Sequence, residues 1–209
     1  MKSYLSVKRN IIDETVIEKS RFICTLKKVD GEDEAKAFVL GVKQKYPDAT
    51  HNCYAYIADE GGFYVKFSDD GEPQGTAGLP MLETLKAKNL KRVAVVVTRY
   101  FGGIKLGTGG LARAYSGCVA KAIELAGISK NVLSSVLKTQ VSYSLYPKIL
   151  KLLETEKSIK IADEYLDNGV AVTFAVPVEN KDDIANKITD YSSGKSAVLE
   201  LKTECLEYL

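Results

Sequence analysis

The stretch from Arg92 to Gly110 constrains the fold of this chain more than any other part. Val93 to Val97 are five consecutive apolar residues, and such a run predicts a strand that is buried on both faces and lies inside a sheet. Apolar residues at helical spacing from Leu111 to Ala126 predict a helix soon afterwards. Between the two, glycine occupies five of nine positions, namely Gly102, Gly103, Gly107, Gly109 and Gly110.

A glycine-rich loop that leads into a helix can bind an anion, because the first amides of the helix lack partners and carry a partial positive charge. Arg99 and Lys105 would add full positive charges, and Tyr100 and Phe101 could stack on a base. The spacing matches neither the dinucleotide motif G-x-G-x-x-G nor the P-loop motif G-x-x-x-x-G-K-S/T. The alternative is that the glycines only allow a tight turn and close packing of the helix against the sheet.

The charge of the chain is nearly balanced overall but differs between its two parts. The 209 residues carry a formal net charge of +2, made up of +5 in residues 1–135 and −3 in residues 136–209. A modestly basic first part is compatible with contact to RNA or the ribosome, although a dedicated nucleic-acid binder is more basic. We expect a cytoplasmic protein, because no apolar run has the length of a membrane span and residues 1–10 lack the apolar core of a secretory signal. The four dispersed cysteines form no C-x-x-C motif, so we expect reduced thiols.

The order of elements after Gly127 predicts a second domain. Apolar alternation, amphipathic stretches and the turn sequence Asp167-Asn168-Gly169 indicate a βαββαβ order, which is the ferredoxin-like pattern. We therefore predict an α+β fold with two domains, residues 1–132 and residues 133–209, with a boundary near Ser129 to Ser135. The expected elements of the second domain are strand 136–144, helix 146–156, strands 159–166 and 170–178, helix 182–191 and strand 197–208.

Two groups of residues offer catalytic alternatives. His51, the only histidine, and Cys53 lie two residues apart on one expected strand, so their side chains share a face and could form a thiol–imidazole pair. The same two side chains could also be buried without a catalytic role. Asp69, Asp70 and Glu72 form an acidic turn that could bind magnesium through carboxylates, or could be a solvated turn whose residues suit its backbone geometry.

Four blocks of sequence between Lys19 and Leu111 carry a family resemblance. In order, they are K-S-R-F-I, A-T-H-N-C-Y-A-Y, S-D-D-G-E-P-Q-G-T-A-G-L-P and V-V-V-T-R-Y-F-G-G-I-K-L-G-T-G-G-L. These blocks resemble the IMPACT family, in its bacterial YigZ-like branch. The resemblance implies that the first domain is the α+β sandwich shared by a small-subunit ribosomal protein and elongation factor G. It also implies that the ferredoxin-like domain is similar to the last domain of that factor.

The resemblance also bears on function. Eukaryotic members of the family regulate translation by competing for the activator of a stress kinase. Their extra N-terminal partner-binding domain is expected to be absent here, because the family core begins near Lys19. A role in binding RNA or the ribosome depends less on that domain. The family resemblance implies no catalytic mechanism.

We therefore predict a non-enzymatic cytoplasmic regulator or accessory factor of translation that binds RNA, the ribosome or a translation-linked protein, without a cofactor or metal. Its predicted binding face spans Arg99 to Gly110. The alternatives are a small-molecule hydrolase or transferase that uses His51 and Cys53 or a metal at Asp69–Glu72, and a regulator that binds only proteins. The residues expected to form one anion-binding or nucleic-acid-binding surface are Arg21, His51, Arg99, Tyr100, Gly102, Gly103, Lys105, Gly107, Gly109 and Gly110.

Overall fold

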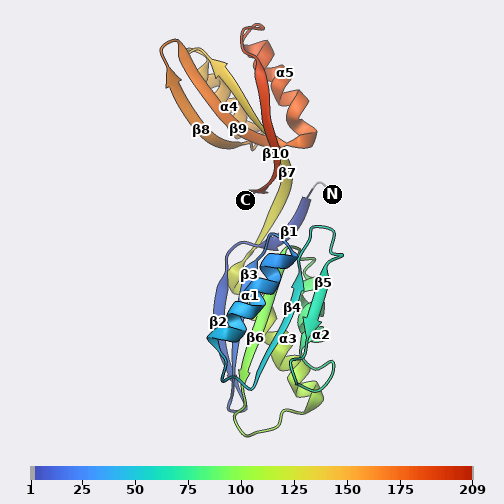
Figure 1. The fold of residues 1–209 in the computed structure, drawn as a ribbon. Helices are drawn as coiled ribbons and strands as arrows, with labels where there is room; N and C mark the ends of the chain where they lie inside the picture. Colours follow the sequence, from blue (N-terminus) through green and yellow to red (C-terminus); the bar gives the residue numbers. More distant parts are fainter. Residues whose placement is uncertain (1–2, 209) are drawn as a thin grey trace. The chain divides into compact units, whose positions relative to one another are not determined.

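The computed structural model describes residues 3–208, which divide into two compact units, Ser3–Lys130 and Asn131–Tyr208 (Figure 1). Each unit combines a β-sheet with helices, so the structure confirms the predicted two-domain α+β fold. The exact domain boundary that the sequence favours, between residues 132 and 133, stays a prediction.

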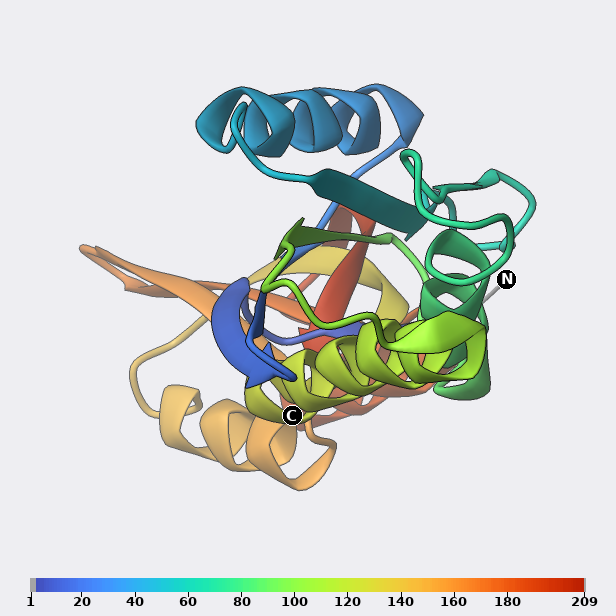
Figure 2. The ribbon, with the colours of Figure 1, turned by 90° about the horizontal axis from the view of Figure 1, so that it is seen from below.

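A five-stranded antiparallel sheet forms the centre of the first unit, in the order β2-β3-β6-β4-β5. The helix α1 (Glu32–Lys45) covers one face, and α2 (Gly78–Ala87) and α3 (Gly107–Ala126) cover the other (Figure 2). A short strand, β1 (Ser3–Val7), precedes these elements. The strands of the sheet are β2 (Ile11–Ile17), β3 (Ser20–Lys28), β4 (His51–Ile57), β5 (Val65–Ser68) and β6 (Val93–Tyr100).

The central strand β6 is buried on both faces, as its sequence predicts. Val93, Val95 and Val97 pack into the core beneath α2 and α3, whereas Ala94 and Val96 pack beneath α1. Successive side chains of a strand point to opposite faces. An unbroken apolar run therefore suits a strand that lies between two helical layers.

The second unit has the ferredoxin-like βαββαβ order. Its strands lie in the order β10-β7-β9-β8, and its two helices pack on one face of the sheet through a core that includes Leu137, Ile149, Phe174 and Ile184. The strand β7 begins within the first unit, and β1 pairs with it. The elements are β7 (Ile128–Val141), α4 (Tyr146–Thr155), β8 (Ile159–Leu166), β9 (Gly169–Pro177), the short 3-10 helix η1 (Val178–Asn180), α5 (Lys181–Tyr191) and β10 (Val198–Tyr208).

The strand β7 begins at Ile128 rather than at Val136, where the sequence predicts its start. Its first half contains buried polar side chains, among them Ser129, Asn131 and Ser134. The alternation of apolar and polar residues that identifies a strand is therefore absent there. Backbone pairing does not depend on that alternation, so the strand continues across the predicted domain boundary.

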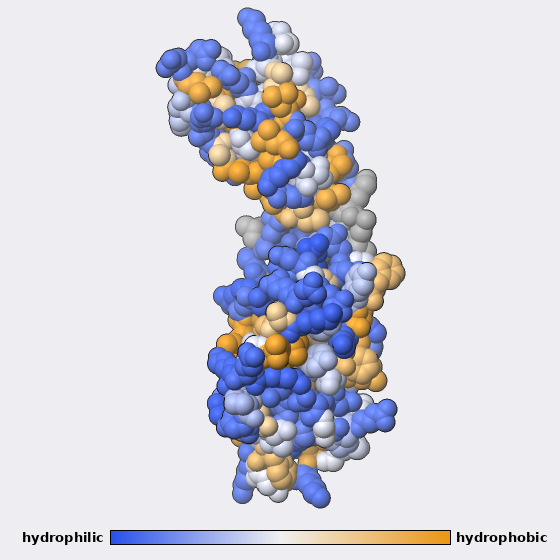
Figure 3. Space-filling view, viewed as in Figure 1, coloured by the Kyte–Doolittle hydropathy of each residue, from blue (hydrophilic) through white to orange (hydrophobic). Residues whose placement is uncertain are grey.

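The face of the first unit that α1 covers is mainly hydrophilic, with small and separate apolar patches (Figure 3). Leu40 on α1, for example, is 57% exposed. Scattered exposed apolar residues of this kind are normal on a protein surface. Within residues 3–208, no helix combines the length and the apolar composition needed to cross a membrane.

Candidate functional site

The strand register divides the predicted site residues between the two faces of the first sheet. In the pairing of β3 with β6, Arg21 lies opposite Tyr100 and Phe22 lies opposite Arg99. In the pairing of β4 with β6, His51 lies opposite Arg99. Residues directly opposite one another point to the same face. Arg99 and His51 therefore share the face of α3, and Arg21 and Tyr100 share the face of α1.

On the α1 face, Arg21 and Tyr100 form a surface cluster with acidic residues. The guanidinium carbon of Arg21 lies 5.4 Å from the centre of the Tyr100 ring, and its Nε pairs with Glu14 Oε1 at 2.8 Å. The Tyr100 hydroxyl donates to Asp48 Oδ1 at 2.9 Å. The expectation of one continuous surface is corrected here, because side-chain alternation along β6 separates Tyr100 from Arg99.

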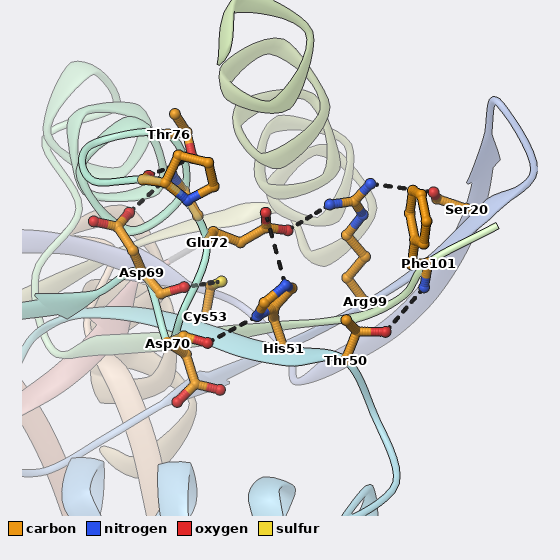
Figure 4. A network of polar contacts seen from close by, with 12 residues as sticks. Ser20, Thr50, His51, Cys53, Asp69, Asp70, Glu72, Thr76, Arg99 and Phe101 are labelled. Atoms are coloured by element: carbon orange, nitrogen blue, oxygen red, sulfur yellow. Dashed lines mark hydrogen bonds and ion pairs between the residues drawn. The ribbon is translucent and has the colours of Figure 1, made fainter. Parts of the chain in front are cut away.

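Arg99 is buried, with 4% of its surface exposed. Its Nη1 donates to Glu72 Oε1 at 2.7 Å, and its Nη2 donates to Ser20 Oγ at 3.3 Å (Figure 4). The rings of Phe22 and Phe101 each have their centres 5.4 Å from the guanidinium carbon. The sequence placed Arg99 on an exposed binding face, whereas the structure pairs its charge with a carboxylate inside the protein.

Glu72, which the sequence places in an acidic turn, is the centre of this buried network. Its carboxylate is 3% exposed and accepts hydrogen bonds from Arg99 and, at 2.8 Å, from the Tyr115 hydroxyl. Burial, together with nearby negative groups, raises the pKa of Tyr115 well above its usual range. Sequence reasoning missed the pair because no spacing rule connects a turn residue to the end of a strand 27 residues later.

His51 lies between the backbone carbonyl of Asp70 and the carboxylate of Glu72. Its Nδ1 is 2.9 Å from the carbonyl oxygen of Asp70, and because a carbonyl oxygen only accepts, Nδ1 carries a proton. Its Nε2 faces Glu72 Oε2 at 3.9 Å (Figure 4). The two ring nitrogens are therefore directed to the turn and to the buried carboxylate, and neither is directed to Cys53.

Cys53 is completely buried, and its thiol donates to the carbonyl oxygen of Asp69 at 2.9 Å. Burial raises the pKa of this thiol to about 12. A nucleophilic cysteine acts as the thiolate, which a raised pKa suppresses at neutral pH. The structure therefore argues against the thiol–imidazole alternative for His51 and Cys53.

The other two carboxylates of the acidic turn are also directed to protein groups. Asp70 accepts a hydrogen bond from the Asn52 amide at 2.7 Å and pairs with Lys43. Burial acts to raise the pKa of Asp70, but the hydrogen bonds from Lys43 and the Asn52 amide outweigh it and lower the pKa. Within residues 3–208 no cluster of three potential metal ligands occurs. Asp69 accepts hydrogen bonds from the amides of Gly75, Ala77 and Gly78.

The glycines that follow β6 have different structural roles. Gly102 packs against the turn between β2 and β3, since a Cβ atom there would lie 2.0 Å from the carbonyl oxygen of Lys19. Its amide donates to Ser20 Oγ at 3.2 Å. Gly103 and Gly107 have left-handed backbone conformations, with φ angles of +88° and +70°, which glycine adopts without strain. Close packing alone accounts for Gly102.

The last three glycines lie within α3 rather than in a loop before it. The helix begins at Gly107, and Gly109 and Gly110 belong to its first turn. Within the described part of the chain, no side chain caps this end and no acidic residue lies in the first turn. Gly107 and Gly109 are exposed, as is Lys105, two residues before the helix begins. The start of α3 is therefore open to solvent and has a cation beside it.

The two units correspond to known domain families. The Impact N-terminal domain matches residues 18–123, and a domain of unknown function, DUF1949, matches residues 139–195. The chain is 42% identical to the IMPACT family member YvyE of Bacillus subtilis, over 99% of this chain and 95% of that protein. It is 36% identical to the IMPACT family member YigZ of Escherichia coli, over 97% of this chain and 100% of that protein.

A solved structure shares both units. It is described as the crystal structure of a hypothetical protein, has a TM-score of 0.62 and a sequence identity of 35%, and the match covers 97% of this chain and 98% of that one. The human protein IMPACT is 43% identical over a shorter stretch of 67 residues, which is 31% of this chain and 20% of that protein. The fold defines a two-domain α+β protein with a ferredoxin-like second unit. The chain belongs to the IMPACT family, and the resemblance found in the sequence is confirmed.

Proposed function

We propose that this protein is a non-enzymatic, cytoplasmic accessory factor or regulator of translation that binds RNA, including RNA of the ribosome, through its first unit. The proposed contact surface is residues 103–110, that is, the loop after β6 together with the first turn of α3, and we call it the α3 entry loop. The observation that carries the proposal is the open, uncapped start of α3 beside Lys105.

The start of α3 favours a phosphate group for two reasons. The first amides of a helix have no partners inside the helix, and the helix dipole places a positive charge of about half a unit at this end. Apart from their chain neighbours and the backbone of α3 itself, no heavy atom lies within 4 Å of the position that a Cβ atom would occupy at Gly103 or Gly107. A phosphate can therefore approach the backbone closely.

Two cations near this helix end favour the same ligand. Lys105 and Arg113 are exposed, and neither forms an ion pair with another residue between 3 and 208. Arg99, by contrast, is neutralised by Glu72. Lys105 and Arg113 are therefore the side chains that we assign to phosphate binding.

Arg99 has a supporting role in the proposal. Its Nη2 and the amide of Gly102 both donate to Ser20 Oγ, at 3.3 and 3.2 Å. The buried Glu72–Arg99 pair thereby fixes the point at which the chain leaves β6. We propose that this anchor holds the α3 entry loop in the conformation that binds RNA.

The proposal is tested by measuring RNA affinity across a series of salt concentrations, with labelled oligoribonucleotides and with purified ribosomes. Replacement of Lys105 with alanine should weaken binding and reduce the dependence of log K on log salt by roughly one unit, because one phosphate contact is lost. Lys88→Ala is the matched control: Lys88 is also an exposed lysine, but it precedes β6, whereas Lys105 follows it. The control variant should bind as the wild type does.

Equal effects of Lys105→Ala and Lys88→Ala would show that general charge, rather than the α3 entry loop, attracts RNA. The proposal fails entirely if wild-type affinity does not exceed that of an unrelated protein of equal net charge. In that case the protein-binding alternative takes its place.

A further inference from the structure

A groove of about 480 Å³ lies beside the α3 entry loop. One side is the end of β2 and the turn after it, which contribute Ile17 and Glu18. The second side is the segment Ile104–Leu106, and the third is the beginning of α3. This volume is in the range of sites that bind small molecules or single groups of a larger ligand.

The walls of the groove are largely apolar. Ile17, Ile104, Leu106 and Ala114 line it, and Ile104 is 39% exposed. Ile17 and Leu106 also pack against the hydrophobic core of the first unit, so the position of these walls is fixed from beneath. An apolar groove whose side chains Ile17 and Leu106 rest on the core suits a flat ring that loses contact with water on entry.

The charged residues at the rim of the groove indicate which polar groups a ligand would need beside its ring. Lys105 and Arg113 line it without ion-pair partners among the described residues, and the open start of α3 adjoins them. Glu18 is the one acidic residue of the lining. A fitting occupant thus has a flat apolar ring, an anionic group for the cations and a hydrogen-bond donor for the carboxylate. A nucleotide with an exocyclic amino group has all three.

We infer that the groove binds one unpaired base of single-stranded RNA, while the adjoining phosphate contacts Lys105 and Arg113. This inference rests on the proposed function, because it names the form of RNA that the same surface recognises. Bases in a duplex are stacked and paired, so they cannot enter the groove. The protein should therefore bind single strands more tightly than duplexes of the same length.

The test compares binding of a short labelled single-stranded oligoribonucleotide with binding of the matching duplex. Ile104→Ser removes one wall at an exposed position, so it should leave the melting temperature unchanged. It should weaken single-strand binding about fifteenfold, because roughly two methylene groups of apolar contact are lost, and leave duplex binding unchanged. Leu40→Ser is the matched control, since Leu40 is an exposed apolar residue on α1, across the sheet from α3. It should alter neither affinity.

The phosphate-binding loop and the base-binding groove can be refuted separately. If Lys105→Ala weakens RNA binding but Ile104→Ser acts like Leu40→Ser, the base-binding groove is wrong and the phosphate-binding loop stands. Equal loss of single-strand and duplex binding by Ile104→Ser would also overturn the groove. If wild-type protein binds neither RNA above a control of equal charge, the proposed function and this inference fall together.

Discussion

The buried pair of Glu72 and Arg99 gives a quantitative prediction about what holds the α3 entry loop in place. The two side chains are 3% and 5% exposed and meet at 2.7 Å. Arg99→Met removes the hydrogen bonds of the guanidinium to Glu72 and to Ser20, and it leaves the Glu72 carboxylate buried without its cation. Loss of one member of a buried ion pair typically costs about 3–5 kcal/mol of unfolding free energy. We expect a loss of that size, because Tyr115 remains as a hydrogen-bond donor but cannot neutralise the carboxylate.

The reciprocal change, Glu72→Leu, should cost about the same, since it leaves a buried guanidinium unpaired. The double variant Glu72→Leu/Arg99→Met contains neither charge, so it should be no less stable than either single variant. An interaction energy of about 3 kcal/mol between the two changes is expected, at the upper end of values measured for residues in contact.

Hydrogen exchange of the backbone amides in β6 and α3, followed by mass spectrometry, measures these free energies within the first unit. This choice avoids assigning a single unfolding transition to a protein with two separate cores. The sequence contains no tryptophan, so intrinsic tryptophan fluorescence offers no substitute. Strictly additive losses in the double variant, or a negligible loss on Arg99→Met, would refute the account of a buried pair that anchors the loop.

Further expectations concern the glycines and the thiols. Gly102→Ala should destabilise the first unit by about 1–3 kcal/mol or more, because the new Cβ would overlap backbone atoms. Gly103→Ala should cost about 1 kcal/mol, because only its positive φ is unfavourable for alanine. Thermal unfolding of the two variants distinguishes these losses, and equal losses would argue against close packing at Gly102. In native protein, iodoacetamide should modify the partly exposed Cys205 before the buried Cys53, as mass spectrometry can show. Burial raises the pKa of the Cys53 thiol to about 12 in the folded state, compared with about 8.5 in an unfolded chain. The contribution of the neutral thiol to the stability of the folded state is therefore complete below about pH 8.5 and is lost progressively as the pH rises towards 12. Stability measured between these limits should fall less steeply in Cys53→Ala, and an unchanged slope would contradict the assignment.

The fold could largely be predicted from sequence because its strongest signals are local. The apolar run from Val93 to Val97 requires a buried strand, and the turn at Asp167-Asn168-Gly169 fixes a hairpin. The start of β7 could not be predicted, because buried serine and asparagine side chains conceal the strand pattern. The start of α3 was also misplaced: glycine has a low helix propensity, yet Gly107 to Gly110 form the first turn.

The candidate site could be predicted only in part, because it depends on register and on long-range pairing. The sequence shows that Arg99 follows a buried apolar run closely, but only the register places Arg99 and Arg21 on opposite faces of the sheet. It shows three acidic residues in one turn, but not that Glu72 alone turns inward to Arg99. Lys105 is the predicted cation that the structure leaves exposed at the start of α3.

The central claim is that RNA binds at the α3 entry loop, and hydrogen exchange in the presence and absence of RNA tests it most directly. The amides of residues 103–113 should exchange more slowly when a single-stranded oligoribonucleotide is bound, because phosphate occupies the open start of α3. Amides of α1, on the opposite face of the sheet, should be unaffected. Protection that falls on α1 or on the second unit, with residues 103–113 unchanged, would contradict the claim.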